Sequence, residues 1–235
     1  MSNTTPDTRD RAILREEIEN LLAQNNRKPT SLDVVAVTKG FSPEIIEQAH
    51  DEGFQIVGEN RVGEALKKEK QVASECSEQL QWHFIGHLQS NKVRKIIGFF
   101  DLLHSVDRMS LVNELEKRLQ RENVEQDILV QVNVSGEESK YGVRPEGCKK
   151  LVEEILKRDS LNLYGLMTMA PLTDNETIIR ETFKECRLLR NHLEDRFSIP
   201  LPELSMGMTN DYPIAIEEGA TFIRLGRALF GERNE

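Results

Sequence analysis

This sequence of 235 residues has few cysteines, and it lacks long apolar runs and an excess of basic residues. Its three cysteines, Cys76, Cys148 and Cys186, follow no metal-binding spacing and are far apart, so we expect free thiols rather than a disulfide framework. Forty acidic residues against 31 basic ones give a net charge of −9, which argues against nucleic acid as a partner. No apolar stretch approaches the roughly 18 residues of a membrane span. We therefore expect a soluble, cytoplasmic protein that does not bind membranes.

The sequence also lacks a linker rich in proline, glycine or serine that would divide it into separate cores. We therefore expect one domain over residues 1–235, which lies in the size range of a single α/β barrel. Apolar residues near the start recur at helical spacing, namely at Ile13, Leu14, Ile18, Leu21 and Leu22. This pattern predicts an outer N-terminal helix within residues 1–26.

Short runs rich in β-branched and aromatic residues recur along the chain, and helical patterns separate most of them. The eight runs cover residues 32–39, 54–57, 82–85, 102–106, 128–132, 163–167, 203–206 and 222–225. Eight alternating strand and helix units predict a TIM-type (β/α)8 barrel. An open, doubly wound sheet is the alternative, because Pro200 and Pro202 precede the seventh run and the helix expected over 213–218 is short.

A single amine, that of Lys39, ends the first of these runs, Leu-Asp-Val-Val-Ala-Val-Thr-Lys. Desolvation lowers the pKa of a lysine from about 10.4 toward neutrality, and the neutral amine is the form that attacks an aldehyde. The pattern is therefore typical of a Schiff-base lysine. A lone lysine at a strand end would more often extend its ammonium into solvent, so this interpretation depends on the other loops of the same face.

Two glycine-containing loops follow the seventh and eighth predicted strands, where TIM-type barrels often bind phosphate. Residues 205–211, Ser-Met-Gly-Met-Thr-Asn-Asp, supply hydroxyls, amides and a glycine at which backbone N–H groups can approach an anion. Residues 224–231, Arg-Leu-Gly-Arg-Ala-Leu-Phe-Gly, place Gly226 at the start of a short helix, whose N-terminus favours a phosphate. Either loop alone would be an ordinary turn, but together they predict a phosphate site.

Polar residues also follow the second predicted strand. The segment Gly58-Glu59-Asn60-Arg61 carries a turn glycine and then three polar residues on the same expected face as Lys39. Asn60 is suited to orient a ligand there, and its alternative role is to cap the following helix.

Two other lysines and two histidines compete for a role at this face. Lys92 and Lys140 also lie in expected strand-end loops, so they are the rival amines to Lys39, although neither follows a comparably apolar strand. His83 and His87 have the spacing of a metal pair on a helix. The strand-like run over 82–85 contradicts a helix there, and we expect no metal site.

An amine after the first strand and a phosphate site after the last two fit an aldehyde that carries a phosphate, such as pyridoxal 5′-phosphate (PLP). Six segments then resemble the pyridoxal-phosphate homeostasis protein family over nearly the whole chain. They are residues 36–39 (AVTK), 58–62 (GENRV), 82–92 (WHFIGHLQSNK), 166–171 (LMTMAP), 204–208 (LSMGM) and 223–226 (IRLG). Members of this family resemble the N-terminal barrel of bacterial alanine racemase.

The resemblance implies that Lys39 forms the Schiff base with PLP. It further implies a phosphate site made by Ser205, Gly207, Gly226 and Arg227, a pyridine-nitrogen contact from Arg224, and ring contacts from Asn60 and Met167. An arginine at the pyridine nitrogen disfavours protonation there, which makes the cofactor a weaker electron sink than in a transaminase.

Three positions depart from the common pattern of the family. Val57 stands where phenylalanine is usual, Gly63 where glutamine is usual, and Asn210 where an acid is usual. The last departure lies in the expected phosphate loop and removes a negative charge from it.

The resemblance implies a non-catalytic protein that holds PLP, delivers it to PLP-dependent apo-enzymes and thereby affects amino-acid and keto-acid balance. Because the sequence ends soon after the eighth strand, we expect no second domain with a catalytic tyrosine, and we expect a monomer. The alternative is a single-domain PLP-dependent amino-acid racemase that uses Lys39 and a second strand-end residue as its two bases. A class I aldolase with Lys39 as the imine-forming amine is a third possibility.

Overall fold

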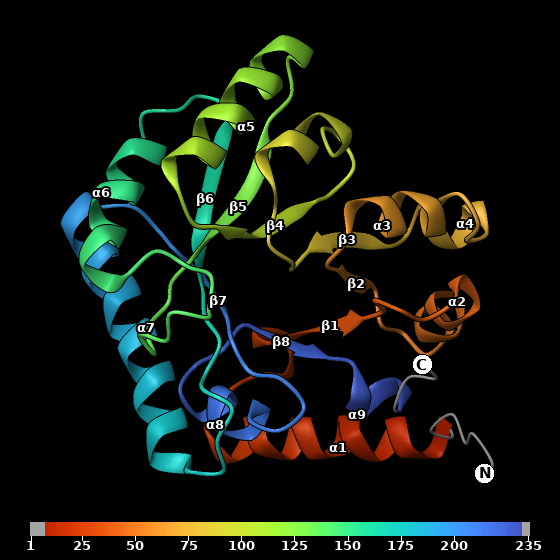
Figure 1. Cartoon of the computed structure of the whole chain (residues 1–235). Coiled ribbons are helices and arrows are strands. Elements are labelled where there is room, and N and C mark those ends of the chain that lie inside the picture. The colour runs from red at the N-terminus through yellow and green to blue at the C-terminus, as the bar shows by residue number, and fades with distance from the viewer. Residues whose placement is uncertain (1–7, 232–235) are drawn as a thin grey trace.

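Eight parallel strands, β1 to β8, close into a barrel in which neighbours in the sequence are neighbours in space (Figure 1). The computed structural model describes residues 8–231. The strands are β1 Asp33–Val37, β2 Ile56–Glu59, β3 Gln81–Phe84, β4 Leu102–Val106, β5 Gln126–Gln131, β6 Leu161–Met167, β7 Glu203–Ser205 and β8 Phe222–Leu225. Each of the eight predicted runs overlaps one strand, and the TIM-type fold is confirmed.

Helices surround the barrel and connect successive strands (Figure 1). The α-helices are α1 Thr8–Gln24, α2 Pro43–Asp51, α3 Val62–Glu69, α4 Ser74–Ser77, α5 Met109–Glu122, α6 Pro145–Ile155, α7 Glu176–Phe197, α8 Tyr212–Glu217 and α9 Arg227–Phe230, and the 3-10 helices are η1 Pro29–Ser31 and η2 Ser90–Lys95. The connection from β3 to β4 carries η2 in place of an α-helix. The barrel is therefore less regular on that side.

The predicted N-terminal helix is present as α1, and residues 1–7 of the predicted range lie outside the described residues. It contacts α8 and α9 and runs alongside them at the bottom of the view (Figure 1). Arg11 Nε donates to the carbonyl oxygen of Leu229 over 2.8 Å, and the Arg15 guanidinium lies 4.4 Å from the ring centre of Phe54. These contacts hold α1 against α9 and against the segment that joins α2 to β2.

The apolar face of α1 is narrower than predicted. Leu14, Ile18 and Leu22 are buried, but Ile13 is 54% exposed, so its placement on the same face was wrong. Consecutive helical residues point about 100° apart, and Leu14 already occupies the direction of the core.

Gly58 was predicted to be a turn glycine after the second strand, but it lies within β2. A Cβ at this position would come within 2.7 Å of Val35 Cγ1 and 3.2 Å of Ile85 Cδ1. Glycine therefore makes room for the two apolar side chains inside the barrel. Asn60 does not cap the next helix, because the N-cap of α3 is Arg61.

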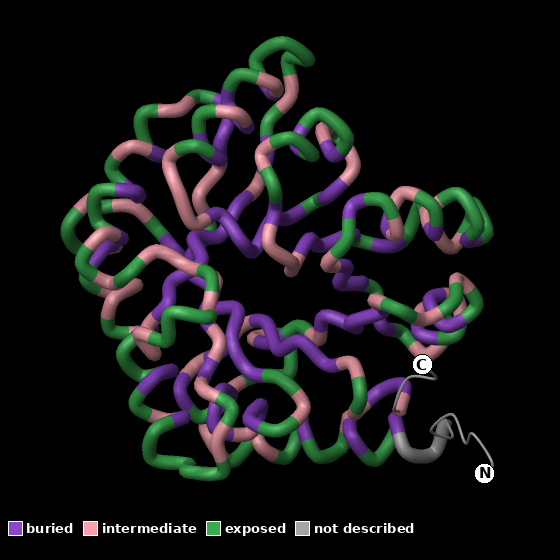
Figure 2. The backbone as a smooth tube through the Cα atoms, viewed as in Figure 1, coloured by how far each residue is buried: buried purple, intermediate pink, exposed green. Residues whose placement is uncertain are grey.

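The core has two apolar layers, and buried residues follow the strands through the centre of the molecule (Figure 2). The larger layer lies between strands and helices. The smaller one lies inside the barrel and comprises one residue from each of six strands: Val35, Ile56, Leu102, Leu129, Met167 and Phe222. Buried His83, His104, Ser205 and Arg224 are polar exceptions among the strand residues and lead to the candidate site.

Candidate functional site

A cavity of about 400 Å³ lies at the carboxyl ends of the strands, mainly between the segments after β1, β6, β7 and β8. Its lining comprises Val37, Lys39, Phe41, Ile85, residues 169–174, Ile179, residues 208–211, Arg224, Gly226 and Arg227. This volume is within the range of small-ligand and cofactor sites. Four of the predicted site residues, Lys39, Arg224, Gly226 and Arg227, line it together.

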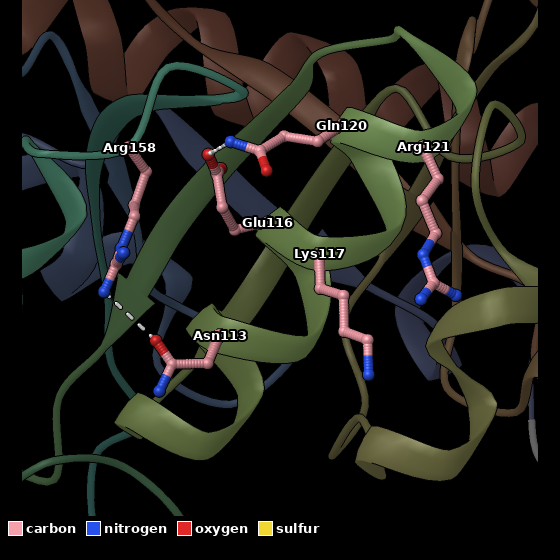
Figure 3. A pocket seen from close by; sticks show the side chains of 6 residues that line it. All are labelled: Asn113, Glu116, Lys117, Gln120, Arg121 and Arg158. Carbon is pink, nitrogen blue, oxygen red and sulfur yellow. Dashed lines mark hydrogen bonds between the residues drawn. The ribbon is translucent and has the colours of Figure 1, made fainter.

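A second cavity, of about 360 Å³, lies on the outside of the barrel and has a different character (Figure 3). Five of its six lining residues belong to α5, and the sixth is Arg158. In the close-up, Arg158 reaches toward Asn113 and Gln120 toward Glu116. Long side chains on the surface of α5 form this cavity, and none of the predicted site residues lines it. The strand-end cavity is therefore the candidate site.

Arg224 brings a positive charge into the candidate site from β8. Its side chain is only 4% exposed, and the guanidinium donates to Ser205 Oγ over 2.7 Å and to the carbonyl oxygen of Thr168 over 3.0 Å. Burial lowers the pKa of Arg224 from its usual range to about 10. The group therefore stays charged at neutral pH, and two fixed acceptors hold it in place.

A chain of hydrogen bonds continues from Arg224 into the barrel. Ser205 Oγ lies 2.8 Å from His104 Nδ1, and His104 Nε2 lies 3.0 Å from His83 Nδ1. Because an arginine can only donate, the Ser205 hydroxyl accepts from Arg224 and is free to donate to His104. When the Ser205 hydroxyl donates to His104 Nδ1, the proton of neutral His104 lies on Nε2 and is donated to His83 Nδ1. The hydrogen bonds then all run in one direction.

Burial keeps His83 and His104 neutral. It lowers the pKa of His83 to about 3 and that of His104 well below 6.5, and the positive charges that His83 and Arg224 would present to His104 act in the same direction. Of the four residues joined by these hydrogen bonds, only Arg224 therefore carries a charge at neutral pH.

Two of the predicted site residues lie deeper than the cavity lining. Ser205 is fully buried, and its hydroxyl is already bonded to Arg224 and His104. Met167 is 1% exposed and belongs to the apolar layer inside the barrel. Two residues further along the chain, Met169 lines the cavity.

Gly207 and Asn60 support the site without being part of the cavity lining. Gly207 has φ +92°, and a Cβ there would come within 2.6 Å of the Ala215 Cβ. Only glycine fits this turn, which carries residues 208–211 back to the cavity. Asn60 lies against Gly86, where an added Cβ would approach the Asn60 carbonyl oxygen to 2.4 Å.

The loops after β7 and β8 are joined at the cavity. Arg227 Nη2 lies 3.5 Å from Asn210 Oδ1, and the amide nitrogen of Ala228 lies 3.4 Å from Thr209 Oγ1. Gly226 is the N-cap residue of α9, as predicted. Thr209, Asn210, Gly226 and Arg227 all line the cavity, so this part of it offers a hydroxyl, an amide, a cation and the start of a helix, an environment suited to an anion.

Thr209 is a lining residue that sequence reasoning did not select. It lies in the predicted phosphate loop, but Ser205 was chosen as the hydroxyl of that loop. The glycine at position 207 was the available signal in the sequence, because a turn at that glycine directs the residues after it, rather than Ser205, toward the cavity.

Asp211 stabilises the same loop. Its Oδ1 accepts from the amide nitrogen of Met208 over 2.5 Å. Burial raises the pKa of Asp211, although the bond from Met208 and the charge of Arg224 oppose this effect. The carboxylate therefore holds the turn that presents residues 208–210 to the cavity.

The two rival lysines differ in their distance from the cavity, because Lys140 bonds to the lining residue Ala170 and Lys92 does not. Lys92 is exposed on η2, and Lys140 Nζ donates to the carbonyl oxygen of Ala170 over 2.8 Å while pairing with Glu137. Neither lysine lines the candidate cavity.

The two histidines with metal-like spacing have different environments. His83 is bonded to His104, whereas the His87 ring stacks on Tyr141 with centroids 3.8 Å apart. Residues 8–231 contain no group of three or more histidine, cysteine or acidic residues arranged to hold a metal ion. The cysteines are free thiols, as expected. Within the same residues, no helix is both long and apolar enough to cross a membrane.

Comparison with known proteins first gives the class that this barrel and its strand-end cavity define. The family profile for the N-terminal domain of alanine racemase matches residues 14–234. Alanine racemase of Clostridium difficile 630 has the same fold, with a TM-score of 0.75 at 12% identity over 94% of this chain and 56% of that one.

Closer relatives then give the family. A pyridoxal phosphate homeostasis protein of Aquifex aeolicus is 42% identical over 93% of this chain and 94% of its own length, and one of Synechocystis is 38% identical over 87% and 93%. The PLP-bound structure of PipY from Synechococcus elongatus has a TM-score of 0.78 at 32% identity, over 91% of this chain and 99% of that one. The chain belongs to the pyridoxal phosphate homeostasis protein family, as the sequence resemblance implied.

Proposed function

We propose that this protein binds PLP in the strand-end cavity and holds it covalently through Lys39. The observation that carries the proposal is that Lys39, the buried cation of Arg224 and the Gly226–Arg227 start of α9 line one cavity of about 400 Å³. An amine, a cation and a group of backbone donors match the aldehyde, ring nitrogen and phosphate of PLP. The PLP-bound PipY structure supports the same cofactor.

The residues of the cavity divide the binding between them. Gly226, Arg227 and Thr209 bind the phosphate, and Gly207 provides the turn that brings Thr209 to it. Arg224 faces the pyridine nitrogen, and Ser205 contributes by holding the Arg224 guanidinium rather than through its own contact with the phosphate.

The ring of the cofactor has apolar neighbours on the walls of the cavity. Phe41, Ile85 and Met169 line the cavity directly. Asn60 and Met167, which were predicted to line the ring, act from just outside this lining, as a loop support and as part of the barrel interior.

The covalent step requires Lys39 in its neutral form. Lys39 Nζ would bond to the aldehyde carbon, and the aldehyde oxygen would leave as water with the two protons that the neutral amine gives up. No oxidant or reductant takes part. PLP supplies an electron-withdrawing ring, and this chain supplies binding, orientation and the amine.

We further propose that the protein is a carrier rather than a racemase, and that it delivers PLP to cytoplasmic apo-enzymes. A racemase that works as alanine racemase does needs a tyrosine as its second base, and of the residues that the structure describes no tyrosine lines the cavity. Tyr141 stacks on His87, Tyr164 is 40% exposed on β6, and Tyr212 is buried in α8. Through this delivery the protein influences the balance of amino acids and keto acids, and it acts as a monomer.

Titration with PLP tests the binding proposal. The purified protein should develop the visible absorbance band of lysine-bound PLP, and Lys39→Ala should abolish the band. Lys92→Ala is the matched control, because Lys92 is exposed and outside the cavity. A wild-type protein without the band, or a Lys39→Ala protein that keeps it, would contradict the proposal.

Turnover distinguishes a carrier from a racemase. The PLP-loaded protein should not interconvert the enantiomers of an amino acid, as followed by chiral chromatography, but should reactivate an apo-enzyme that depends on PLP. Racemisation that Lys39→Ala abolishes would establish the alternative function. Size-exclusion chromatography with light scattering should give the mass of one chain, 26.9 kDa.

A further inference from the structure

An ionic cluster contacts the backbone on both sides of Lys39, and none of its residues lines the cavity. We define it as Glu59 at the end of β2 together with Glu64 and Lys68 of α3. Lys68 is 5% exposed and Glu59 is fully buried. Glu64 is partly exposed, with 24% of its side-chain surface accessible. Burial of an ionisable side chain such as Glu59 or Lys68 opposes folding unless it is well paired.

Lys68 uses all of its hydrogen-bonding capacity within this cluster. Its Nζ lies 2.7 Å from Glu59 Oε1, 2.7 Å from Glu64 Oε1 and 2.7 Å from the carbonyl oxygen of Thr38. An ammonium group has three N–H donors and no acceptor, so these three acceptors satisfy it completely. Lys68 is therefore a fixed cation and not a second reactive amine.

The cluster holds the two peptide groups on either side of Lys39. The Thr38 carbonyl that accepts from Lys68 belongs to the peptide bond before Lys39. The Gly40 amide that donates to Glu64 Oε1 over 2.5 Å belongs to the peptide bond after it. The Thr38 hydroxyl also donates to Glu59 Oε1 over 2.7 Å. The peptide groups before and after Lys39 are thus both hydrogen-bonded to this cluster.

The conformation of the chain after Lys39 agrees with such a restraint. Gly40 has φ +75°, a left-handed conformation that favours glycine. Phe41, the next residue, donates its amide to the Thr38 carbonyl over 3.0 Å and lines the cavity with its side chain. The turn therefore leaves the backbone direction of Lys39 little freedom.

The charges of the two acids are consistent with a permanently formed cluster. Burial raises the pKa of Glu59, although the bonds from Lys68 and Thr38 act against it. Burial also acts on Glu64, but the bonds from Lys68 and the Gly40 amide outweigh it and lower its pKa. Glu64 is therefore ionised near neutral pH and pairs with the Lys68 ammonium.

We infer that Glu59, Glu64 and Lys68 are positioning residues that aim the Lys39 side chain at the aldehyde carbon of a bound phosphorylated aldehyde. The inference rests on the proposed function, because it assigns the cluster a role in the covalent step of that site. Small errors in the placement of a reacting group cost large factors in rate and affinity. Fixing both peptide groups of the lysine is a direct way to avoid them.

A double-mutant cycle with Lys39 separates positioning from general support of the fold. Glu64→Ala removes the acceptor of the Gly40 amide at a partly exposed position, so folding is expected to survive. In the presence of Lys39 it should weaken PLP binding about tenfold and slow the appearance of the visible band by a similar factor. In the Lys39→Ala background it should change the affinity for PLP less than about twofold, as measured by fluorescence titration.

Lys68→Met extends the test, and Lys67→Met is its matched control on the same helix, since Lys67 is exposed. Lys68→Met should reproduce the dependence on Lys39 with a larger effect, while Lys67→Met should bind PLP like the wild type. If Lys68→Met does not fold, the Glu64→Ala cycle alone decides the matter.

Two results would overturn the inference. Equal weakening of PLP binding in both backgrounds would mean that the cluster only supports the barrel, and wild-type binding by Glu64→Ala would mean that it has no role at Lys39. A wild-type protein that shows no lysine-bound PLP at all would overturn the proposed function together with the inference. A wild-type band with either of the first two results would overturn the inference alone.

Discussion

His83 and His104 are neutral groups buried inside the barrel, and this gives the stability of the protein a pH dependence. Burial lowers the pKa of His83 to about 3 and that of His104 well below 6.5. The unfolded chain binds protons at both residues once the pH falls below about 6.5, whereas the folded chain does not. The stabilisation is therefore complete above pH 6.5 and is lost as the pH falls.

His83→Gln should reduce this pH dependence. Between pH 7 and pH 5 each histidine removes on the order of 1.5–2 kcal/mol from the free energy of unfolding. Urea denaturation at the two pH values should show the variant losing less stability than the wild type by about this amount. His192→Gln, at an exposed position on α7, is the control and should behave as the wild type. Equal losses in His83→Gln and the wild type would contradict the account.

Thr209 and Ser205 offer two different hydroxyls for the phosphate, and substitution tests which of them binds it. Thr209 lines the cavity, while the Ser205 hydroxyl is bonded to Arg224 and His104. Thr209→Val should weaken PLP binding about tenfold, the value of one hydrogen bond to a charged group. It should leave binding of pyridoxal, which lacks the phosphate, unchanged.

Ser205→Ala is the comparison. It should weaken PLP and pyridoxal by similar factors, because its effect passes through the Arg224 guanidinium at the ring. Fluorescence titration with both ligands separates the two cases. A selective loss of PLP binding in Ser205→Ala, with Thr209→Val unaffected, would restore the direct phosphate contact that the sequence resemblance implies.

At the scale of single elements, strand β6 carries an irregularity that fixes its distance from β7. The register with β5 shifts so that Leu163 pairs with Ile128 while Gly165 pairs with Leu129, and Tyr164 between them is 40% exposed. A Cβ at Gly165 would lie 1.9 Å from the Glu203 carbonyl oxygen on β7. The two strands can approach this closely only at a glycine.

Gly165→Ala should therefore destabilise the protein by about 3 kcal/mol or more, because backbone atoms on two paired strands must move. Gly63→Ala is the matched control, since Gly63 lies in helix α3 and a Cβ there meets nothing within 4 Å. The control should raise the stability by about 0.5–1 kcal/mol. Thermal unfolding of both variants measures the difference, and a Gly165→Ala protein as stable as the wild type would contradict the assigned close approach.

The strands could be predicted from the sequence because each is a local pattern, and the runs over 102–106 and 222–225 coincide with β4 and β8. The directions of their side chains could not, because they depend on pairing between distant segments. Ser205 bonds with His104, 101 residues away, and with Arg224, 19 residues away. The register shift in β6 and the interior position of Gly58 could not be predicted for the same reason. Each depends on contacts with another segment of the barrel, namely the β7 backbone for Gly165 and the Val35 and Ile85 side chains for Gly58.

Only some residues of the candidate site could likewise be placed from the sequence. Lys39, Gly226 and Arg227 lie directly at strand ends, so their placement on the active face follows from the fold class. Ser205 and Met167 lie within the barrel, and Thr209 reaches the cavity only because the chain turns at Gly207. A sequence pattern identifies such a loop but does not show which of its side chains faces the ligand.

At the scale of the whole molecule, the proposed ligand connects segments from both halves of the chain. Lys39 follows β1, while Arg224, Gly226 and Arg227 belong to β8 and the segment after it. PLP at about 100 times its dissociation constant should therefore stabilise the folded wild type by about 2.7 kcal/mol and raise its melting temperature. Lys39→Ala should show a smaller rise at the same PLP concentration in thermal unfolding. A larger or equal rise in the variant would contradict covalent binding at Lys39.

Chemical trapping tests the central claim most directly. The PLP-loaded protein is reduced with borohydride, digested and mapped by mass spectrometry. A single pyridoxyl label is expected on the peptide that contains Lys39, and no label on any peptide of Lys39→Ala. A label on Lys92 or Lys140 with Lys39 unmodified would contradict it, because neither of those lysines lines the cavity in which Arg224 and the start of α9 meet.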